Sequence, residues 1–342
     1  MKICIYGAGA VGGYLGVLLK RGGADVSLIA RGPHLATIRQ NGMKLLIGGC
    51  ELIEHMPATD NPAELGPQDY VVICLKSHQA WEVAGDMAPL FGPTTAVVTA
   101  QNGIPWWYFY GLEGQYANLQ PQSVDPDSRQ WRLIGPHRAI GCTVYPATEI
   151  VAPGVIKHIY GDRFGLGEPT RKETDRVRRL AQAFEAGKLK AKIHPEIRND
   201  IWLKLWGNLC FNPISTLTHA TLDVIATESG TRTVARKMME EAERIARRIG
   251  VHFRVDIERR INGAAAVGAH RTSMLQDLEK GRPLEIDALL TVVQEMGRLV
   301  DVETPTIDTV LALVQQMGRV AGVYPTFPEA SLAEEPAAVS VD

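Results

Sequence analysis

Residues 2–23, KICIYGAGAVGGYLGVLLKRGG, decide the fold of the N-terminal half of the chain. The apolar run KICIY leads into glycines spaced as G-x-G-x-x-G, and residues with helical spacing follow. The first glycine permits a tight turn, the second lets the backbone approach a pyrophosphate, and the third lets the helix pack close to the strand. The N-terminus of that helix would bind the phosphates. We expect a dinucleotide to contact the residues of this turn, Gly7, Ala8, Gly9, Ala10, Val11 and Gly12.

The end of the second expected strand bears on which dinucleotide binds. Residues 25–30, DVSLIA, are followed by Arg31 and Gly32. Proteins that prefer NAD usually carry Asp or Glu here to bind the ribose hydroxyls, and such a carboxylate would repel a 2′-phosphate. Arg31 can instead bind that phosphate, so the sequence favours NADPH over NADH. The alternative is an arginine in an exposed loop.

Two further strands are expected to end in polar residues. The runs YVVICLK (70–76) and TAVVTAQNG (95–103) are typical of buried parallel strands, and they bring Lys76 and Asn102 to the strand ends. Open α/β sheets bind ligands at the carboxyl ends of their strands. The alternatives are a solvated strand end for Lys76 and a simple turn at Asn102.

The spacing of apolar residues divides the chain into two domains. Strand-like runs continue up to KLKAKI, which ends at Ile193, and from Pro195 the periodicity is helical throughout. We predict an α/β fold with an N-terminal Rossmann-type NADP-binding domain over 1–194, followed by an all-helical C-terminal domain over 195–325. Residues 326–342 are expected to fray as a tail. The helical segments are predicted at 198–217, 230–249, 257–267, 285–300 and 306–320. A cleft between two such domains is a common place for an active site.

Composition excludes several classes of protein. The chain has 342 residues, 22% charged residues and a formal net charge of −2, which argues against a nucleic-acid or membrane-surface partner. Five scattered cysteines without a CxxC pair indicate buried thiols in a reducing compartment. The nine histidines form no HxxxH or HExxH pair, so we predict no metal. The start of the chain lacks a leader and no apolar run reaches about 18 residues, which predicts a cytoplasmic protein.

IWLKLWGNLCFNPI, residues 201–214, combines an apolar helix with one polar stripe. Lys204, Asn208 and Asn212 are four residues apart, so they share one face of a helix. Asn forms helices poorly, and Pro213 bends or ends a helix. The stripe therefore either faces solvent on a surface helix or lines a polar cleft.

HRTSMLQDLEKGRPLEID, residues 270–287, adds two polar candidates, Ser273 and Glu285. Each has a structural alternative. Ser273 with Gln276 has the spacing of a capping box. Pro283 suits the first position of a following helix, which places Glu285 in a first turn where the helix dipole favours a carboxylate.

Taken in order, seven stretches over residues 1 to about 320 resemble the ketopantoate reductase family (2-dehydropantoate 2-reductases). They are GAGAVGGYLG, ARG, CLKSHQ, QNG, NDIWLKLWGNLCFNPI, TSMLQDLEKGRPLEID and VETPTID. The resemblance implies NADPH-dependent reduction of ketopantoate to (R)-pantoate in pantothenate and coenzyme A synthesis. Hydride transfer to the keto carbon leaves an alkoxide that needs a proton donor.

The resemblance also implies roles for single residues. Lys204 matches the catalytic lysine, which acts as general acid, and Glu285 matches the active-site glutamate. Asn208, Asn212 and Ser273 match substrate-binding residues. Lys76 and Asn102 match residues beside the nicotinamide and the substrate, and Arg31 matches the residue that favours NADPH.

Residues 104–137 depart from the family pattern, because this aromatic-rich segment is longer than in compact members. It is expected either to line or cover the substrate end of the cleft or to form a contact in a homodimer. Two alternative functions stay open: a D-2-hydroxyacid dehydrogenase acting on another, bulkier 2-keto acid, and a non-catalytic NADP-binding sensor. Retention of both Lys204 and Glu285 argues against the sensor.

Overall fold

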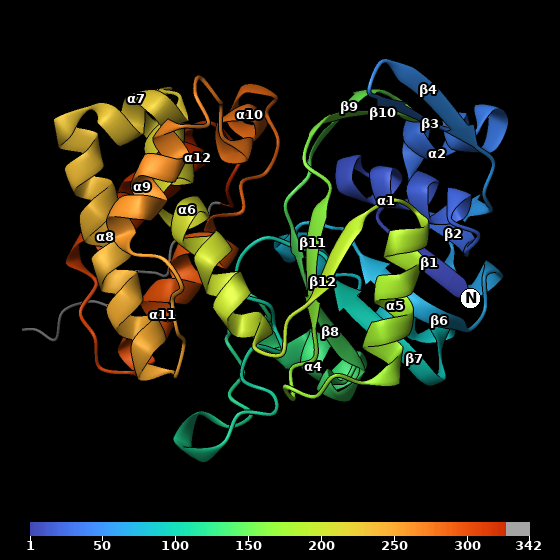
Figure 1. The fold of residues 1–342 in the computed structure, drawn as a ribbon, viewed down its shortest axis with the longest axis horizontal. Helices are drawn as coiled ribbons and strands as arrows, with labels where there is room; N and C mark the ends of the chain where they lie inside the picture. Colours follow the sequence, from blue (N-terminus) through green and yellow to red (C-terminus); the bar gives the residue numbers. More distant parts are fainter. Residues whose placement is uncertain (326–342) are drawn as a thin grey trace, which may run out of the picture.

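The computed structural model describes residues 1–325, in which an α/β half and a helical half lie side by side (Figure 1). Helix α6 (Ile197–Thr218) packs against strands of the first half and helices of the second. The predicted boundary between residues 194 and 195 falls in the short link between β12, which ends at Ile193, and α6. The predicted tail over 326–342 lies outside the described residues. None of the helices in residues 1–325 is both long and apolar enough to span a membrane.

The main sheet has eight strands in the order β12-β11-β8-β7-β6-β1-β2-β5. All neighbours are parallel except β11 and β8. Helices α1 (Ala10–Arg21) and α5 (Asp175–Ala186) pack together and contact the sheet. The strands are β1 (Lys2–Tyr6), β2 (Asp25–Ile29), β5 (Ala58–Thr59), β6 (Gln68–Ile73), β7 (Phe91–Thr99), β8 (Ala139–Val144), β11 (Arg163–Gly167) and β12 (Lys190–Ile193). This sheet confirms the predicted Rossmann-type half.

A second sheet, which the sequence analysis did not predict, has the order β4-β3-β10-β9 and packs on α1. Its strands are β3 (Met43–Ile47), β4 (Cys50–Glu54), β9 (Ala147–Ala152) and β10 (Val155–Tyr160). Helix α1 is therefore covered on two sides, which explains why it is buried along most of its length. This half also contains the helices α2 (Gly32–Asn41), α3 (Ser77–Ala80) and α4 (Arg129–Leu133). Its short 3₁₀ helices are η1 (Pro62–Glu64), η2 (Gly85–Leu90), η3 (Gly114–Tyr116), η4 (Pro126–Ser128) and η5 (Pro136–Arg138).

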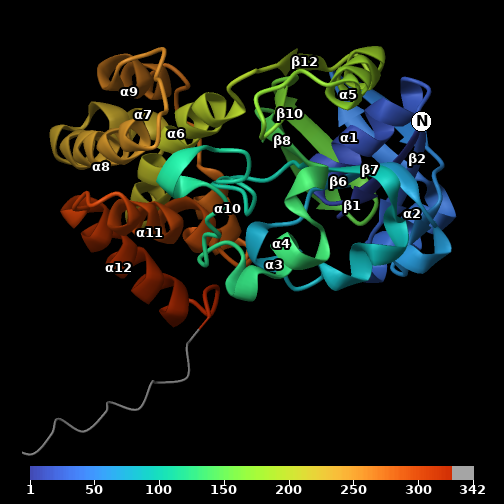
Figure 2. The ribbon, with the colours of Figure 1, turned by 90° about the horizontal axis from the view of Figure 1, so that it is seen from below.

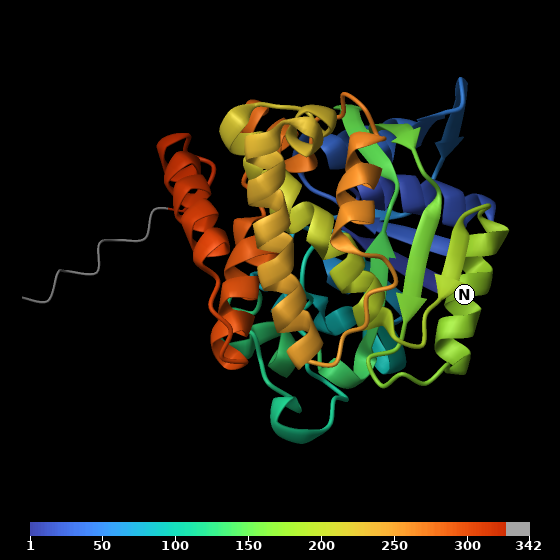
Figure 3. The ribbon, with the colours of Figure 1, turned by 60° about the vertical axis from the view of Figure 1, so that its left-hand side comes forward.

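The second half is helical, as predicted. Figure 3 shows its helices packed beside one another next to the main sheet. They are α6, α7 (Leu222–Thr227), α8 (Ser229–Arg248), α9 (Ile257–Ala265), α10 (Ser273–Glu279), η6 (Asp287–Thr291), α11 (Val292–Leu299) and α12 (Pro305–Val320). The short α7 was not predicted. Pro213 does not end α6, which continues to Thr218.

The larger hydrophobic cluster extends through both halves. It joins side chains of the main sheet to those of α6, α8, α11 and α12, and the aromatic run Trp106–Phe109 lies within it. These four aromatic side chains are at most 2% exposed, so they neither cover the cleft nor form a contact with another copy. The segment 104–137 runs along the edge where the two halves meet, and part of it projects below them in Figure 1 and lies in front of them in Figure 2. Glu295 of α11 accepts hydrogen bonds from the backbone N–H groups of Gln122 and Ser123 of this segment at 2.8 and 2.9 Å.

Candidate active site

A cleft of about 2040 Å³ lies between the two halves. The stripe of Lys204, Asn208 and Asn212 faces this cleft, so the solvent-facing alternative is wrong. Most of the other candidate residues also line it: Gly7, Gly9, Ala10, Val11, Lys76 and Asn102 from the α/β half, and Ser273 and Glu285 from the helical half. Ala8, Gly12 and Arg31 are not among the lining residues. Ala8 and Gly12 are buried, and Arg31 is exposed.

The glycine turn keeps the space before α1 open. Gly7 follows β1 with φ +101°, and a Cβ there would lie only 2.7 Å from Cδ2 of Leu75. Gly9 is the N-cap residue of α1, no side chain caps this helix end, and no heavy atom lies within 4 Å of the position of a Cβ on Gly9. The first N–H groups of a helix have no partner within the helix and attract anions. The turn therefore fits the pyrophosphate of a dinucleotide.

His34 of α2 supports this turn. Its Nδ1 accepts a hydrogen bond from the backbone N–H of Gly154 at 2.9 Å, so the ring proton is on Nε2, which donates to the carbonyl oxygen of Ala8 at 2.7 Å. His34 was not among the predicted site residues, because a single histidine on a short helix belongs to no motif. Arg31, three residues earlier, is the N-cap residue of α2 and follows the end of β2.

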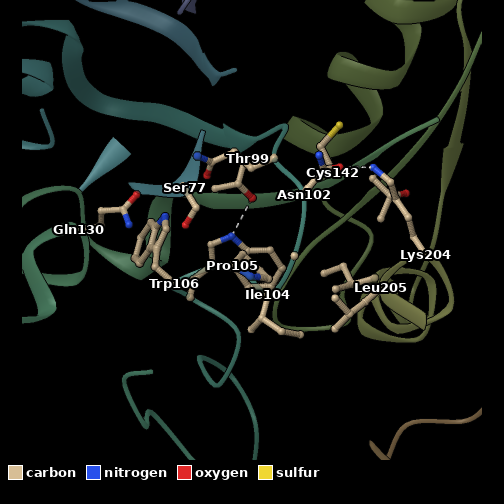
Figure 4. A pocket seen from close by; sticks show the side chains of 15 residues that line it. Ser77, Thr99, Asn102, Ile104, Pro105, Trp106, Gln130, Cys142, Lys204 and Leu205 are labelled. Carbon is tan, nitrogen blue, oxygen red and sulfur yellow. Dashed lines mark hydrogen bonds between the residues drawn. The ribbon is translucent and has the colours of Figure 1, made fainter. Parts of the chain in front are cut away.

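Lys204, Asn102 and Glu285 form a hydrogen-bonded chain across the cleft. Nζ of Lys204 donates to Oδ1 of Asn102 at 2.8 Å, and Nδ2 of Asn102 donates to Oε2 of Glu285 at 3.1 Å. Figure 4 shows the Lys204 side chain extending from α6 to Asn102, which follows β7. The amide thus joins a cation and a carboxylate that come from different parts of the helical half.

The surroundings of Lys204 tune its ammonium group. Burial lowers the pKa of Lys204 to about 8, and Cys142, Glu285 and Asp200 oppose this shift. Burial raises the pKa of Glu285, and this shift is opposed by the charge of Lys76 and by the hydrogen bond from Asn102. An ammonium whose pKa is near neutral is mostly protonated at pH 7 and releases its proton readily. Lys204 is therefore suited to general acid catalysis.

Asp200 and Tyr145 are two cleft residues that the sequence analysis missed. Tyr145 Oη donates to Oδ1 of Asp200 at 3.1 Å, and Thr143 Oγ1 donates to Oδ2. Nζ of Lys204 lies 6.0 Å from the centre of the Tyr145 ring. Asp200 is four residues before Lys204, so it extends the polar stripe by one turn, and that spacing could have revealed it.

Lys76 connects the two halves. Its Nζ pairs with Oδ2 of Asp277 at 2.8 Å and donates to the carbonyl oxygen of Pro283 at 2.6 Å. Lys76 is therefore not the solvated strand end that the sequence allowed as an alternative.

The structural alternatives for Ser273 and Glu285 are also wrong. Helix α10 is capped by Thr272, whose hydroxyl accepts from the N–H of Leu275 at 3.3 Å, so Ser273 is exposed and has no capping role. Glu285 precedes the helix, because η6 begins at Asp287 and its N-cap residue is Ile286. Neither residue is needed to start a helix.

A small cavity of about 20 Å³ lies behind Asn102 (Figure 4). Trp106 and Gln130 from the segment 104–137 line it, together with Cys142 and Leu205. A cavity of this size has room for about one water molecule. The aromatic segment therefore forms part of the wall of this small cavity, and none of its residues lines the large cleft.

Residues 1–325 contain no cluster of three or more His, Cys, Asp or Glu side chains that could hold a metal ion.

Known proteins that resemble this chain indicate which chemistry the cleft performs. The family model described as ketopantoate reductase PanE/ApbA matches residues 3–168, and the one described as ketopantoate reductase PanE/ApbA C terminal matches residues 196–318. A 2-dehydropantoate 2-reductase of Mesorhizobium japonicum is 52% identical over 308 residues, which cover 90% of this chain and 94% of that protein.

Solved structures share the whole fold. A Ralstonia solanacearum protein assigned as a ketopantoate reductase superposes with a TM-score of 0.91 at 40% identity, covering 94% of this chain and 99% of that one. A D-mandelate dehydrogenase solved with NADH and anilino(oxo)acetate has a TM-score of 0.80 at 20% identity, covering 94% and 100% of the two chains. At that identity the second likeness concerns the fold alone.

Proposed function

Because the chain belongs to the ketopantoate reductase family, we propose that it reduces 2-dehydropantoate to (R)-pantoate with NADPH, in pantothenate and coenzyme A biosynthesis. It is an oxidoreductase that acts on CH–OH donors with a pyridine nucleotide. The observation that supports the proposal most is the hydrogen-bonded chain of Lys204, Asn102 and Glu285, which faces the glycine turn across one cleft.

The cofactor site is assigned to the α/β half. The turn from Gly7 to Gly12 would hold the pyrophosphate at the N-terminus of α1. Arg31, exposed beyond the end of β2, would bind the 2′-phosphate, and Lys76 and Asn102 would lie beside the nicotinamide. The bound nucleotide supplies the hydride. This arrangement favours NADPH, since Arg31 stands where a carboxylate would favour NADH.

Lys204 is assigned as the general acid. The keto oxygen gains negative charge as the keto carbon accepts hydride, and the ammonium of Lys204 donates a proton to that oxygen. Asn102 fixes the position of Nζ by accepting its hydrogen bond. Glu285 holds the amide of Asn102 in turn, and its negative charge helps to keep Lys204 protonated.

Substrate binding is assigned to the remaining polar residues of the helical half. Asn208 and Asn212 follow Lys204 at one and two turns of α6, and Asn212 is 5% exposed at the buried end of the stripe. Ser273, at the start of α10, lines the same cleft. These amides and this hydroxyl can hydrogen-bond the oxygen atoms of a 2-keto acid and fix its orientation.

The bulkier 2-keto acid has less support. It rests on the aromatic residues of 104–137, and the run Trp106–Phe109 of this segment lies inside the hydrophobic core. Steady-state oxidation of NADPH with ketopantoate and with a panel of bulkier and aromatic 2-keto acids tests the assignment. We expect the highest kcat/KM with ketopantoate. Turnover with none of the acids, despite tight NADPH binding, would instead support a non-catalytic sensor.

A further inference from the structure

Arg260 of α9 is a cation in the cleft that the proposed mechanism does not use. Its side chain lines the cleft and is partly buried, and the described residues offer its guanidinium neither a hydrogen bond nor an ion pair. The two acids at the start of this helix have other partners: Asp256 caps the helix by accepting from the backbone N–H of Arg259 at 2.7 Å, and Glu258 pairs with Arg232 at 2.8 Å and with Arg236 at 2.6 Å. The guanidinium is therefore left with five unused N–H donors.

Gly207 of α6 provides the space for this guanidinium. A Cβ added to Gly207 would overlap Nη2 of Arg260 and would lie 3.0 Å from its Cζ. Gly207 comes three residues after Lys204 and directly before Asn208, so the guanidinium rests on α6 between two residues of the proposed site. Any larger residue at 207 would displace it.

Within residues 1–325, no carboxylate forms an ion pair with the guanidinium of Arg260. Burial lowers the pKa of Arg260, and the two groups that oppose this shift are Cys210 and Tyr145. Burial raises the pKa of the Cys210 thiol and of the Tyr145 phenol, so both groups are neutral at pH 7. A partly desolvated cation without a counter-charge is unfavourable, and an anionic ligand would relieve that cost.

On the basis of the proposed function, we propose that Arg260 binds the carboxylate of the 2-keto acid substrate, and that Gly207 makes room for it. In a 2-keto acid the carboxylate is bonded directly to the carbon that accepts hydride. A carboxylate-binding group must therefore stand beside the proton donor, and Gly207 lies within one turn of Lys204 on α6. A planar guanidinium binds a carboxylate through two parallel hydrogen bonds, which also fixes the plane of the substrate.

The position of Arg260 favours the substrate over the cofactor as its ligand. The glycine turn that suits the pyrophosphate follows β1 in the α/β half, and Arg31 follows β2. Arg260 lies in the helical half, on α9, and α9 contacts α6, which carries Lys204 and Asn208. The neighbouring Arg259 is exposed at the edge of the same cleft and offers a matched control of equal charge.

The test compares ketopantoate with an uncharged analogue, its methyl ester, in Arg260→Gln, Arg259→Gln and the unchanged protein. We expect Arg260→Gln to lower kcat/KM for the acid by about 10- to 100-fold, the range for losing a hydrogen bond to a charged group. In the same variant, kcat/KM for the methyl ester should change by less than about 3-fold. The ratio of kcat/KM for the acid to that for the ester should therefore fall. Arg259→Gln should keep that ratio, and Arg260→Lys should restore part of it.

Gly207→Ala provides a second route to the same result, because alanine is a better helix former than glycine and should leave α6 folded. It should displace the guanidinium and reduce the preference for the acid. Titration of pantoate into the complex with NADP⁺ measures substrate-site binding without turnover. The dissociation constant for pantoate should rise in Arg260→Gln.

Equal losses for acid and ester, or a rise confined to the KM for NADPH, would overturn the assignment of Arg260. If Arg260→Gln lowers the melting temperature strongly, unchanged acid preference in Gly207→Ala would overturn it as well. Failure of the unchanged protein to reduce any 2-keto acid is a separate outcome, which would remove the proposed function.

Discussion

At the scale of single residues, the clearest prediction concerns the effect of Lys204 on kcat. Lys204→Ala should lower kcat by about 10²- to 10⁴-fold, the usual contribution of a general acid, because no other cation donates to Asn102 in the described residues. The dissociation constant for NADPH, measured by fluorescence titration, should change little. Lys192→Ala, which removes an exposed lysine from the lining of the same cleft, is the control. Retention of kcat in Lys204→Ala would rule out its role as proton donor.

The pKa of Lys204 sets the pH dependence of both directions of the reaction. Burial lowers that pKa to about 8, so the proton donor is lost as the pH rises through this value. Reduction of ketopantoate, followed as kcat/KM, should therefore decline above about pH 8, whereas oxidation of pantoate needs the neutral amine and should increase.

Glu285→Gln removes a charge that opposes this lowering of the Lys204 pKa. The carboxylate raises the pKa of Lys204, so its removal should move the decline in reduction to lower pH. A midpoint that stays in place or moves to higher pH would contradict the coupling between Glu285 and Lys204.

The proposed role of Arg31 is to favour NADPH over NADH. Arg31→Ala should raise the KM for NADPH by about 10- to 100-fold through loss of a charge-assisted contact, and should leave the KM for NADH nearly unchanged. Steady-state kinetics with both nucleotides measures this difference. Equal weakening of the two would show that Arg31 does not bind the 2′-phosphate.

At the scale of elements, two neighbouring residues at the start of α10 have different expected roles, one in capping the helix and one in the proposed substrate site. Thr272 caps this helix, and its neighbour Ser273 faces the cleft. Thr272→Ala should lower the free energy of unfolding by about 1 kcal/mol. Ser273→Ala should raise the KM for ketopantoate with little change in stability. Thermal unfolding and kinetics on both variants test this division, and the opposite pattern would refute it.

The elements also show how far sequence patterns reach. The parallel strands and long helices were predictable, because buried strands are continuously apolar and amphipathic helices repeat every 3.6 residues. The second sheet was missed although Gly48-Gly49 between β3 and β4 is a recognisable hairpin signal. The six-residue α7 is too short to establish a period.

The site was only partly predictable for a related reason. The spacing of Lys204, Asn208 and Asn212 gave their shared face, but not which way that face points. Asn102 and Glu285 are 183 residues apart, and their hydrogen bond depends on how the two halves pack. Local rules also favoured a capping role for Ser273, which the adjacent Thr272 fills instead. Arg260 belongs to no sequence motif. Only the structure shows that its guanidinium packs against Gly207 of α6.

At the scale of the whole molecule, one hydrophobic cluster extends through both halves, and a second lies within the α/β half. The larger cluster contains Val71 and Val97 of the main sheet, the aromatic run Trp106–Phe109, and side chains of α6. Arg198 of α6 strengthens this junction, since its guanidinium donates to the carbonyl oxygens of Tyr108, Pro169 and Tyr110 at 2.7, 2.7 and 2.6 Å. The segment 104–137 thus joins the two halves.

A shared core predicts that both halves unfold together. Trp107 is fully buried, and its Nε1 donates to Oγ1 of Thr99 at 2.9 Å, so Trp107→Ala should cost about 3 to 5 kcal/mol. Calorimetry should show one transition for the unchanged chain and one transition at lower temperature for the variant, because the lost contacts belong to both halves. Trp131→Ala, which truncates a partly exposed tryptophan of the same segment, should cost less. Two separate transitions, with only one of them shifted by Trp107→Ala, would mean that each half has an independent core.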